Sequence, residues 1–255
     1  GDLDRDGRPE LVTGDAGGYY YVLDSAGKQL ASANLGKATS LFPGAYTVKV
    51  HNTTATAEGK DGGPTNLQTG ALEVTGSTDE YYYILDSAGT QLASATFQKK
   101  TALLPGSWVV KVNETRVPVE IKPGETTTAQ TGTLMVRGTT NEYYYVLDAA
   151  GSQLASARLG KSTALFPGSC KVKVNNSTAP ATITAGQIAD IATGTVNAKK
   201  TGTEYYYVLD SNGSQLASAQ VNRPSALLPG EYTVRIGDSR KQAAVSAGKD
   251  TALTW

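Results

Sequence analysis

The sequence predicts an all-β protein, built as a tandem array of four small β-sandwich (Ig-like) repeats of 62 residues. The first observation behind this prediction is a tyrosine triplet that returns at constant spacing. The triplets begin at Tyr19, Tyr81, Tyr143 and Tyr205, each 62 residues after the last. The second is that each repeat holds about seven short strand-like segments between turn residues, with no segment of helical periodicity.

The repeat extends well beyond the triplet. LDSAGKQLASA at residues 23–33 returns with few changes at 85–95, 147–157 and 209–219. LFPGAYTVKV at 41–50 returns at 103–112, 165–174 and 227–236. A glycine turn recurs at Gly62, Gly124, Gly186 and Gly248. Constant spacing indicates four equivalent units. The predicted boundaries are 1–69 (an acidic N-terminal loop and repeat 1), 70–131, 132–193 and 194–255.

The third repeat illustrates the expected elements in order. GTLMVRG (132–138) alternates apolar and polar residues, and YYYVLD (143–148) has high strand preference. The DAAG turn and the following SQLASAR (152–158) would complete a hairpin. TALFPG (163–168) is a short strand that ends in a Pro-Gly turn, and CKVKVN (170–175) alternates as a half-buried strand does. ATITAG (181–186) and IADIATG (188–194) are expected to form another hairpin.

The tyrosine triplet is expected to sit on a strand that faces the core on one side only. Side chains alternate across a strand, so Tyr81, Tyr83 and Leu85 share one face and Tyr82 takes the other. Because Leu85 precedes the turn, we predict that Tyr83 and Leu85 point inward. The middle tyrosines would then form an outer interaction surface of Tyr20, Tyr82, Tyr144 and Tyr206.

Three roles are open for this surface. The first is packing between strands, or between repeats of one chain, because a repeat of this size buries only about 60% of its unfolded surface and gains from its neighbours. The second is contact between chains of a polymer, or with another surface protein. The third is stacking against sugar rings, although Trp108 and Trp255, which would suit that role, fall outside the repeat pattern.

The order of these motifs resembles the PEGA-like and carboxypeptidase-regulatory-like β-sandwich repeats of bacterial surface proteins. The resemblance rests on Leu147-Asp148 before Gly151, on Leu165-Phe166-Pro167-Gly168, and on Val172 and Val174. It covers all four repeats, although the tyrosine triplet departs from the usual pattern. The resemblance implies an extracytoplasmic spacer or scaffold without catalysis.

The N-terminal segment GDLDRDGRPE is similar to the calcium loop of FG-GAP/VCBS-type repeats. Asp2, Asp4 and Asp6 occupy alternate positions, a glycine follows, and Glu10 is the fourth acid. Alternate carboxylates before a glycine can collect oxygen ligands around a hard cation. We therefore expect Ca²⁺ there as the one possible cofactor. The alternative is a solvated acidic turn.

Sequons for N-glycosylation cluster just after the valine-rich strand, at Asn52, Asn113, Asn175 and Asn176. A further sequon stands at Asn212. Use of these sites requires an exposed loop in a glycosylating host.

Composition and the repeat itself exclude several functions. Lysine plus arginine total 23, as do aspartate plus glutamate, so no net charge steers the chain to nucleic acid. No apolar run reaches the roughly 20 residues that span a bilayer, so no membrane insertion is expected. The one cysteine, Cys170, permits no internal disulfide. The acids that recur at Asp24, Asp86, Asp148 and Asp210 are explained as turn residues.

We therefore predict a non-enzymatic extracellular or cell-surface protein. It would be a stalk, a scaffold or the subunit of a surface filament, assembled through sheet edges and tyrosine-rich contacts. Its partners would be copies of itself, in head-to-tail or lateral assembly, or other surface proteins. The alternative is a carbohydrate-binding or adhesin module that uses exposed tyrosines.

Overall fold

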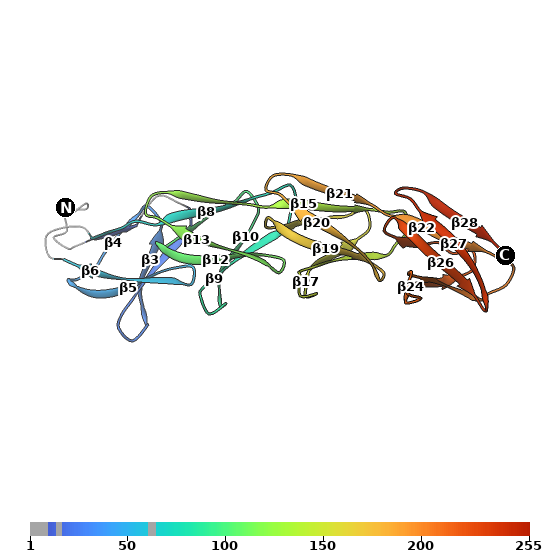
Figure 1. The fold of residues 1–255 in the computed structure, drawn as a ribbon. Helices are drawn as coiled ribbons and strands as arrows, with labels where there is room; N and C mark the ends of the chain where they lie inside the picture. Colours follow the sequence, from blue (N-terminus) through green and yellow to red (C-terminus); the bar gives the residue numbers. More distant parts are fainter. Residues whose placement is uncertain (1–9, 14–16, 61–64) are drawn as a thin grey trace. The chain divides into compact units, whose positions relative to one another are not determined.

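The protein is all-β, as the sequence predicts. The structure, a computed structural model, describes residues 10–13, 17–60 and 65–255, and within these ranges strands and their turns make up the fold (Figure 1). The chain divides into two compact units: residues 1–112 with 116–130, and residues 113–115 with 131–255. None of the described segments is a helix of the length and apolarity needed to cross a membrane.

Seven described strands fall within each predicted repeat. The first repeat holds β1 (Glu10–Thr13), β2 (Tyr19–Leu23), β3 (Gln29–Asn34), β4 (Ala38–Ser40), β5 (Gly44–Val50), β6 (Thr53–Gly59) and β7 (Thr65–Leu67). The second holds β8 (Gly70–Thr75), β9 (Tyr81–Leu85), β10 (Gln91–Thr96), β11 (Lys100–Leu103), β12 (Gly106–Val112), β13 (Thr115–Ile121) and β14 (Thr126–Gln130). The third holds β15 (Gly132–Arg137), β16 (Tyr143–Leu147), β17 (Gln153–Arg158), β18 (Ser162–Leu165), β19 (Gly168–Val174), β20 (Ser177–Ile183) and β21 (Ile188–Ala192). The fourth holds β22 (Gly194–Lys199), β23 (Tyr205–Leu209), β24 (Gln215–Gln220), β25 (Ser225–Leu227), β26 (Gly230–Ile236), β27 (Ser239–Val245) and β28 (Asp250–Thr254).

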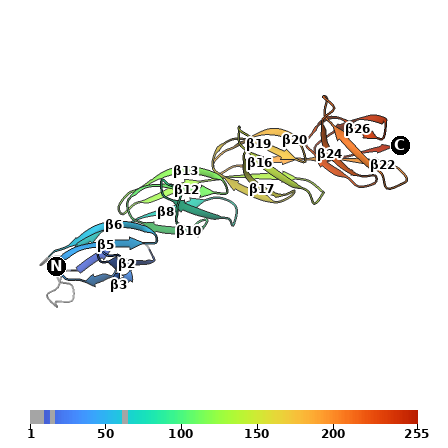
Figure 2. The same ribbon diagram turned by 90° about the horizontal axis from the view of Figure 1, so that it is seen from below.

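Each repeat is a sandwich of a three-stranded and a four-stranded sheet. In the third repeat the orders are β18-β15-β21 and β17-β16-β19-β20. In Figure 1, β15 and β21 lie above β17 and β19, and Figure 2 shows the four strands of the larger sheet from below. The larger sheet is antiparallel throughout. In the smaller sheet, the first strand of the repeat pairs parallel with the last. The other three repeats have the same two strand orders.

One predicted hairpin is wrong. β20 and β21, which contain most of ATITAG and IADIATG, are neighbours in sequence but belong to different sheets. β20 pairs with β19, and β21 crosses to the other layer to pair with β15. The glycine turn between them therefore makes the crossover. Its glycines have left-handed φ angles, 71° at Gly124, 69° at Gly186 and 70° at Gly248, which favour glycine.

The core of each repeat lies between its two sheets. In the third repeat it contains Leu134 and Val136 from the smaller sheet, and Tyr144 and Val172 from the larger one. Cys170 is buried in the same core, and burial raises the pKa of its thiol. A glycine begins the first strand at Gly132, where a Cβ would collide with the carbonyl oxygen of Thr184.

Candidate functional site

The middle tyrosine of each triplet is in the core, so the predicted outer surface of Tyr20, Tyr82, Tyr144 and Tyr206 is wrong. All four side chains have a relative exposure of 0%. Each phenol donates a hydrogen bond to the carbonyl oxygen 17 residues later, at 2.8 to 3.0 Å. These acceptors are Lys37, Lys99, Lys161 and Arg223. Each acceptor lies just before the fourth strand of its repeat, so the phenol ties the larger sheet to the smaller one.

Burial of these phenols has an electrostatic consequence. Loss of solvation raises the pKa of Tyr20, Tyr82 and Tyr206, because the charged phenolate is disfavoured away from water. At Tyr206 the negative charges of Glu142 and Asp250 raise the pKa further. The neutral tyrosine is therefore the form that the fold requires.

The wrong face was chosen because the leucine at the strand end does not mark the core side: it is only half-buried in β2 and β16. On the partner strand of β16 the register skips Leu154, because Val146 pairs with Ala155 and Leu147 with Gln153. This bulge lies on β17, so it leaves the alternation of β16 intact: Tyr144 and Val146 are buried, and Tyr145 between them is exposed. In the second repeat Leu85 is buried although alternation puts it on the face of the exposed Tyr81 and Tyr83, so a buried leucine at this position does not identify the core face.

The first tyrosine of each triplet is exposed, and the third is partly exposed next to a cation. In the cross-strand register the third tyrosine stands opposite a lysine or arginine: Tyr21 with Lys49, Tyr83 with Lys111, Tyr145 with Lys173 and Tyr207 with Arg235. The Arg235 guanidinium lies 5.2 Å from the ring centroid of Tyr207, within cation–π range. The outer face of each larger sheet therefore combines aromatic surface with positive charge.

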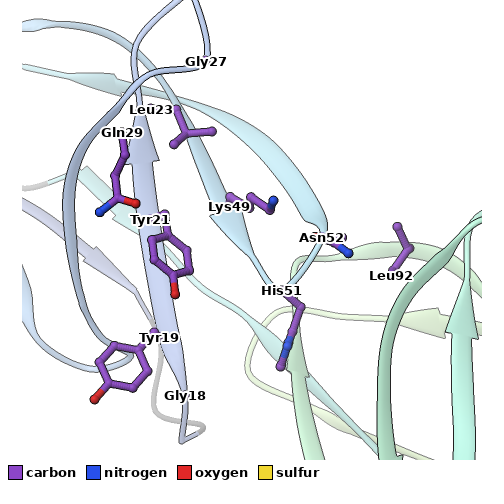
Figure 3. Close-up of a pocket in the computed structure, with 10 residues that line it drawn as sticks. All are labelled: Gly18, Tyr19, Tyr21, Leu23, Gly27, Gln29, Lys49, His51, Asn52 and Leu92. Carbon is purple, nitrogen blue, oxygen red and sulfur yellow. The ribbon is translucent and has the colours of Figure 1, made fainter.

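In the first repeat this face borders an open groove of about 710 Å³. Figure 3 shows the rings of Tyr19 and Tyr21 on the same strand, with Gln29 on one side and Lys49 on the other. Asn52 and Leu92 complete its wall, so the groove includes residues of the first and second repeats. Such a lining can stack against a flat ligand and donate hydrogen bonds to it.

The same groove marks the place where the first unit joins two repeats. We use the name hairpin tip for the turn between the fifth and sixth strands of a repeat, together with the first residue of the sixth strand. In the first repeat the hairpin tip is residues 51–53. The N–H of Asn52 donates to the carbonyl of Leu92 at 3.2 Å, and Thr53 Oγ1 accepts from the N–H of Leu104 at 3.4 Å. Leu92 is the residue skipped at the bulge of β10, so its carbonyl is available to a neighbour.

The second unit contains the same junction between the third and fourth repeats. The N–H of Asn176 donates to the carbonyl of Leu216 at 3.0 Å, and Ser177 Oγ accepts from the N–H of Leu228 at 3.1 Å. The Asn175 amide adds hydrogen bonds to Ala226 O, at 2.9 Å, and to Glu142 Oε1, at 2.9 Å. Residues 113–115 also belong to this unit and form the equivalent tip, in which Glu114 N donates to Leu154 O at 2.9 Å.

An apolar residue completes each junction. It directly precedes the repeated Pro-Gly and is here called the plug residue: Phe42, Leu104, Phe166 and Leu228 in the four repeats. Leu104 belongs to the core cluster of the first repeat, together with Tyr20 and Val50. Leu228 likewise belongs to the core cluster of the third repeat. Full burial of such a side chain contributes about 1.5–3 kcal/mol, so the plug residue couples the stability of two repeats.

These junctions were not predicted from the sequence. Two signals could have indicated them. An apolar residue stands before Pro-Gly in all four repeats, where an ordinary surface loop would tolerate a polar one. A hydroxyl residue is the last residue of each tip: Thr53, Thr115, Ser177 and Ser239. The junctions found within each unit consist of a hairpin tip and a plug residue. The sequence instead predicts tyrosine contacts between neighbouring repeats. Each described sheet takes its strands from a single repeat.

The predicted calcium loop cannot be placed. Asp2, Asp4 and Asp6 lie outside the described residues, and Glu10 begins β1, where its backbone pairs with Ser40. In the described part of the chain, no group of three or more His, Cys, Asp or Glu side chains could hold a metal ion. The calcium site stays a prediction.

The sequons occupy two environments. Asn52 and Asn176 are exposed, whereas Asn113 and Asn175 are half-buried and use their side-chain amides in hydrogen bonds. A glycan at either half-buried asparagine would compete with the junction. Glycosylation of Asn52 or Asn176 remains a prediction.

The recurrent aspartates act in turns, as predicted. Asp86 Oδ1 accepts hydrogen bonds from the N–H groups of Ala88, at 2.9 Å, and Thr90, at 2.8 Å. Asp210 makes the same pair of bonds with Asn212 and Ser214. This is an Asx-type turn, which needs a carboxylate for local geometry.

Comparison with known proteins gives no family assignment. No family model matches the sequence, and no curated protein matches it. Among solved structures, the Bacillus anthracis TIE protein is similar with 12% identity and a TM-score of 0.23, over 100% of this chain and 75% of that one. BcpA, the major pilin subunit of Bacillus cereus, has 9% identity and a TM-score of 0.23, over 74% of this chain and 98% of that one. Likeness at this level supports no functional argument.

Proposed function

We propose that the chain is a non-enzymatic structural repeat protein of the cell surface, a stalk or scaffold whose neighbouring repeats are coupled. The observation that carries the proposal is the junction of hairpin tip and plug residue, which recurs with equivalent residues in both units. A spacer needs contacts that keep one repeat from moving freely against the next. A core that continues across the junction supplies such contacts, because packed interiors resist deformation.

The rest of the proposal depends on sequence-level expectations. Extracellular location follows from the composition and from the resemblance to PEGA-like and carboxypeptidase-regulatory-like repeats, which implies a spacer without catalysis. The recurrent carboxylates hold turns, so they are not free to form a catalytic pair. Self-assembly and contacts with other surface proteins belong to the same proposal.

A mutation in one repeat with a readout in another tests this function. We expect Leu228→Ala, in the fourth repeat, to destabilise the third, whose core it enters. The readout is the labelling rate of Cys170, the only thiol, which is buried in the third repeat. Truncation of a buried leucine costs about 2–5 kcal/mol, so labelling through local opening is expected to accelerate at least tenfold.

Leu253→Ala is the matched control, because Leu253 packs against the core of the fourth repeat alone. It is expected to leave Cys170 labelling nearly unchanged while the fourth repeat stays folded. Equal effects of the two variants, or no effect of Leu228→Ala, would reject coupled repeats.

A second candidate function is carbohydrate binding. The groove of the first repeat favours it, because the exposed ring of Tyr19 and the half-buried ring of Tyr21 lie beside Gln29 and Lys49. The tyrosines concerned are the first and third of the triplet, since the middle one is buried. A glycan array probed with the full chain tests the idea. Signal that Tyr19→Ala removes and Tyr205→Ala retains would place binding in this groove, and an array without signal would dismiss it.

A further inference from the structure

The larger sheet of the third repeat carries three cations on its outer face. Side chains alternate across its four strands, and the inward ones form the core of the repeat. The outward positions are occupied by Arg158, Lys171 and Lys173, together with Tyr143 and Tyr145. None of the four strands contains aspartate or glutamate. The charged groups of this face are therefore all positive, although the whole chain has no net charge.

These three cations have no acidic partner among the residues that the structure describes. The guanidinium carbon of Arg158 lies 5.3 Å from the ring centroid of Tyr143, and its Nε donates to the phenol oxygen at 3.1 Å. The amines of Lys171 and Lys173 form no ion pair and no hydrogen bond with any described side chain. Their charges are therefore available to a ligand.

The two sheets of the third repeat differ in this respect. On the smaller sheet, Arg137 of β15 donates to Asp190 Oδ1 of β21 at 2.9 Å, so that cation is neutralised. The larger sheet of the fourth repeat shows the same excess of positive charge. Arg235 and Arg240 stand directly opposite each other on β26 and β27, beside Tyr207. Like charges in such a pair repel, so an anion bound between the two arginines would stabilise the sheet.

The tyrosines of the third repeat lie between its cations. The strand that bears both rings, β16, is flanked by β17 with the arginine and by β19 with the two lysines. Tyr143 stands opposite Arg158, and Tyr145 stands opposite Lys173. Neighbouring strands are about 4.8 Å apart, so β17 and β19 are roughly 10 Å apart. A polymer that crosses these strands would meet a cation, an aromatic ring and a second cation in turn.

We propose that this face binds an acidic polysaccharide, a chain of sugars that carries carboxylate or sulfate groups. The arginine and the lysines would hold the acidic groups through charge-assisted hydrogen bonds. The rings of Tyr143 and Tyr145, which are 45% and 37% exposed, would pack against the C–H faces of the sugars. Gln153, Ser156 and Thr178 are exposed on the same face and would bind the sugar hydroxyls.

The composition of the face favours a polysaccharide over a nucleic acid. A nucleic acid carries a charge on every nucleotide, and proteins that bind it neutralise many phosphates. Three cations among hydroxyls, amides and aromatic rings suit a ligand with fewer charges and many hydroxyls. The inference extends the second candidate function, carbohydrate binding, to charged sugars and to a surface other than the groove of the first repeat.

Affinity electrophoresis of the full chain tests the proposal, in gels that contain hyaluronan, chondroitin sulfate or uncharged dextran. We expect retardation by at least one of the two acidic polysaccharides and none by dextran. Combining Lys171→Gln with Lys173→Gln should raise the dissociation constant at least tenfold, and Tyr145→Ala should raise it several-fold. Added salt should weaken binding, because it screens exposed charges.

The matched control combines Lys122→Gln with Lys249→Gln. It removes the same charge from two exposed crossover turns and should leave retardation nearly unchanged. Thermal melting of each variant shows whether it is folded, and both lysine pairs are expected to melt as the wild-type chain does because these side chains lie at the surface.

Three outcomes overturn the proposal. The first is equal mobility in all three gels. The second is retardation that the Lys171 and Lys173 variant leaves unchanged, which would assign binding to another surface, such as the groove of the first repeat. The third is competition by polyglutamate or single-stranded DNA that equals competition by the polysaccharide, which would assign the face to another class of polymer. None of them affects the coupling of repeats, because that is measured at Cys170 with Leu228→Ala.

Discussion

Replacement of one buried hydroxyl tests the role of the triplets most sharply. In Tyr206→Phe the ring stays and the hydroxyl oxygen is removed. That oxygen lies 2.8 Å from both Val196 O and Arg223 O. A buried hydrogen bond contributes about 0.5–1.5 kcal/mol net, and an acceptor left without its donor adds to the loss. We therefore expect the fourth repeat to lose about 1–2 kcal/mol of stability.

Native-state hydrogen exchange of the full chain is the suitable assay, because a chain of several repeats does not unfold in one two-state step. About 1.4 kcal/mol corresponds to a tenfold change in protection. Amides of β22 and β23 are expected to lose five- to thirtyfold in protection. Tyr205→Phe is the matched control, one residue away and exposed, and its effect should stay within about 0.5 kcal/mol. Unchanged protection in Tyr206→Phe, or equal losses in both variants, would refute the buried role.

Three further predictions concern Tyr206, the junction in the second unit and the predicted calcium loop. Because burial raises the pKa of Tyr206 above its usual 10.0, the folded state keeps the phenol proton that the unfolded chain loses. The contribution of Tyr206 to the stability of the fourth repeat is therefore fully present below pH 10 and is lost as the pH rises further. Denaturation at several alkaline pH values should show a smaller loss of stability in Tyr206→Phe than in the wild-type chain. Ser177→Ala removes the acceptor of the buried Leu228 N–H and should cost about 1–3 kcal/mol, seen as faster exchange at that amide, whereas unchanged exchange would argue against the junction. Added Ca²⁺ should raise the melting temperature of the first repeat and Asp4→Ala should abolish the rise, while a wild-type chain that ignores Ca²⁺ would rule out the site.

The fold class was predictable from the sequence because the same pattern of strand and turn residues occurs four times in one chain. Strand-forming segments and turn residues that recur at the same positions fix the number and order of strands, and the strands containing Tyr143, Gly168 and Gly132 lie where predicted. Pairing was less predictable. β20 and β21 look like a hairpin in sequence, and only the packing of two layers sends β21 to the other sheet.

Most of the candidate site could not be predicted from the sequence, because the burial of each tyrosine depends on local details of its strand. The choice between Tyr82 and Tyr83 was made from Leu85, which is buried although alternation puts it on the face of the exposed Tyr83. A tyrosine with a polar end also fits either a wet surface or a core that offers an acceptor, here the carbonyl of Lys99. The junction needed three-dimensional information, because Leu104 reads as part of its own repeat but packs into the preceding one.

The central claim is that neighbouring repeats within a unit are mechanically coupled. Nuclear magnetic relaxation of the backbone amides tests this claim most directly. The rotational correlation times of the third and fourth repeats are compared in the full chain. Coupled repeats predict one common value and one common diffusion tensor, and Leu228→Ala should separate them. Different correlation times for the two repeats in the wild-type chain would contradict the account.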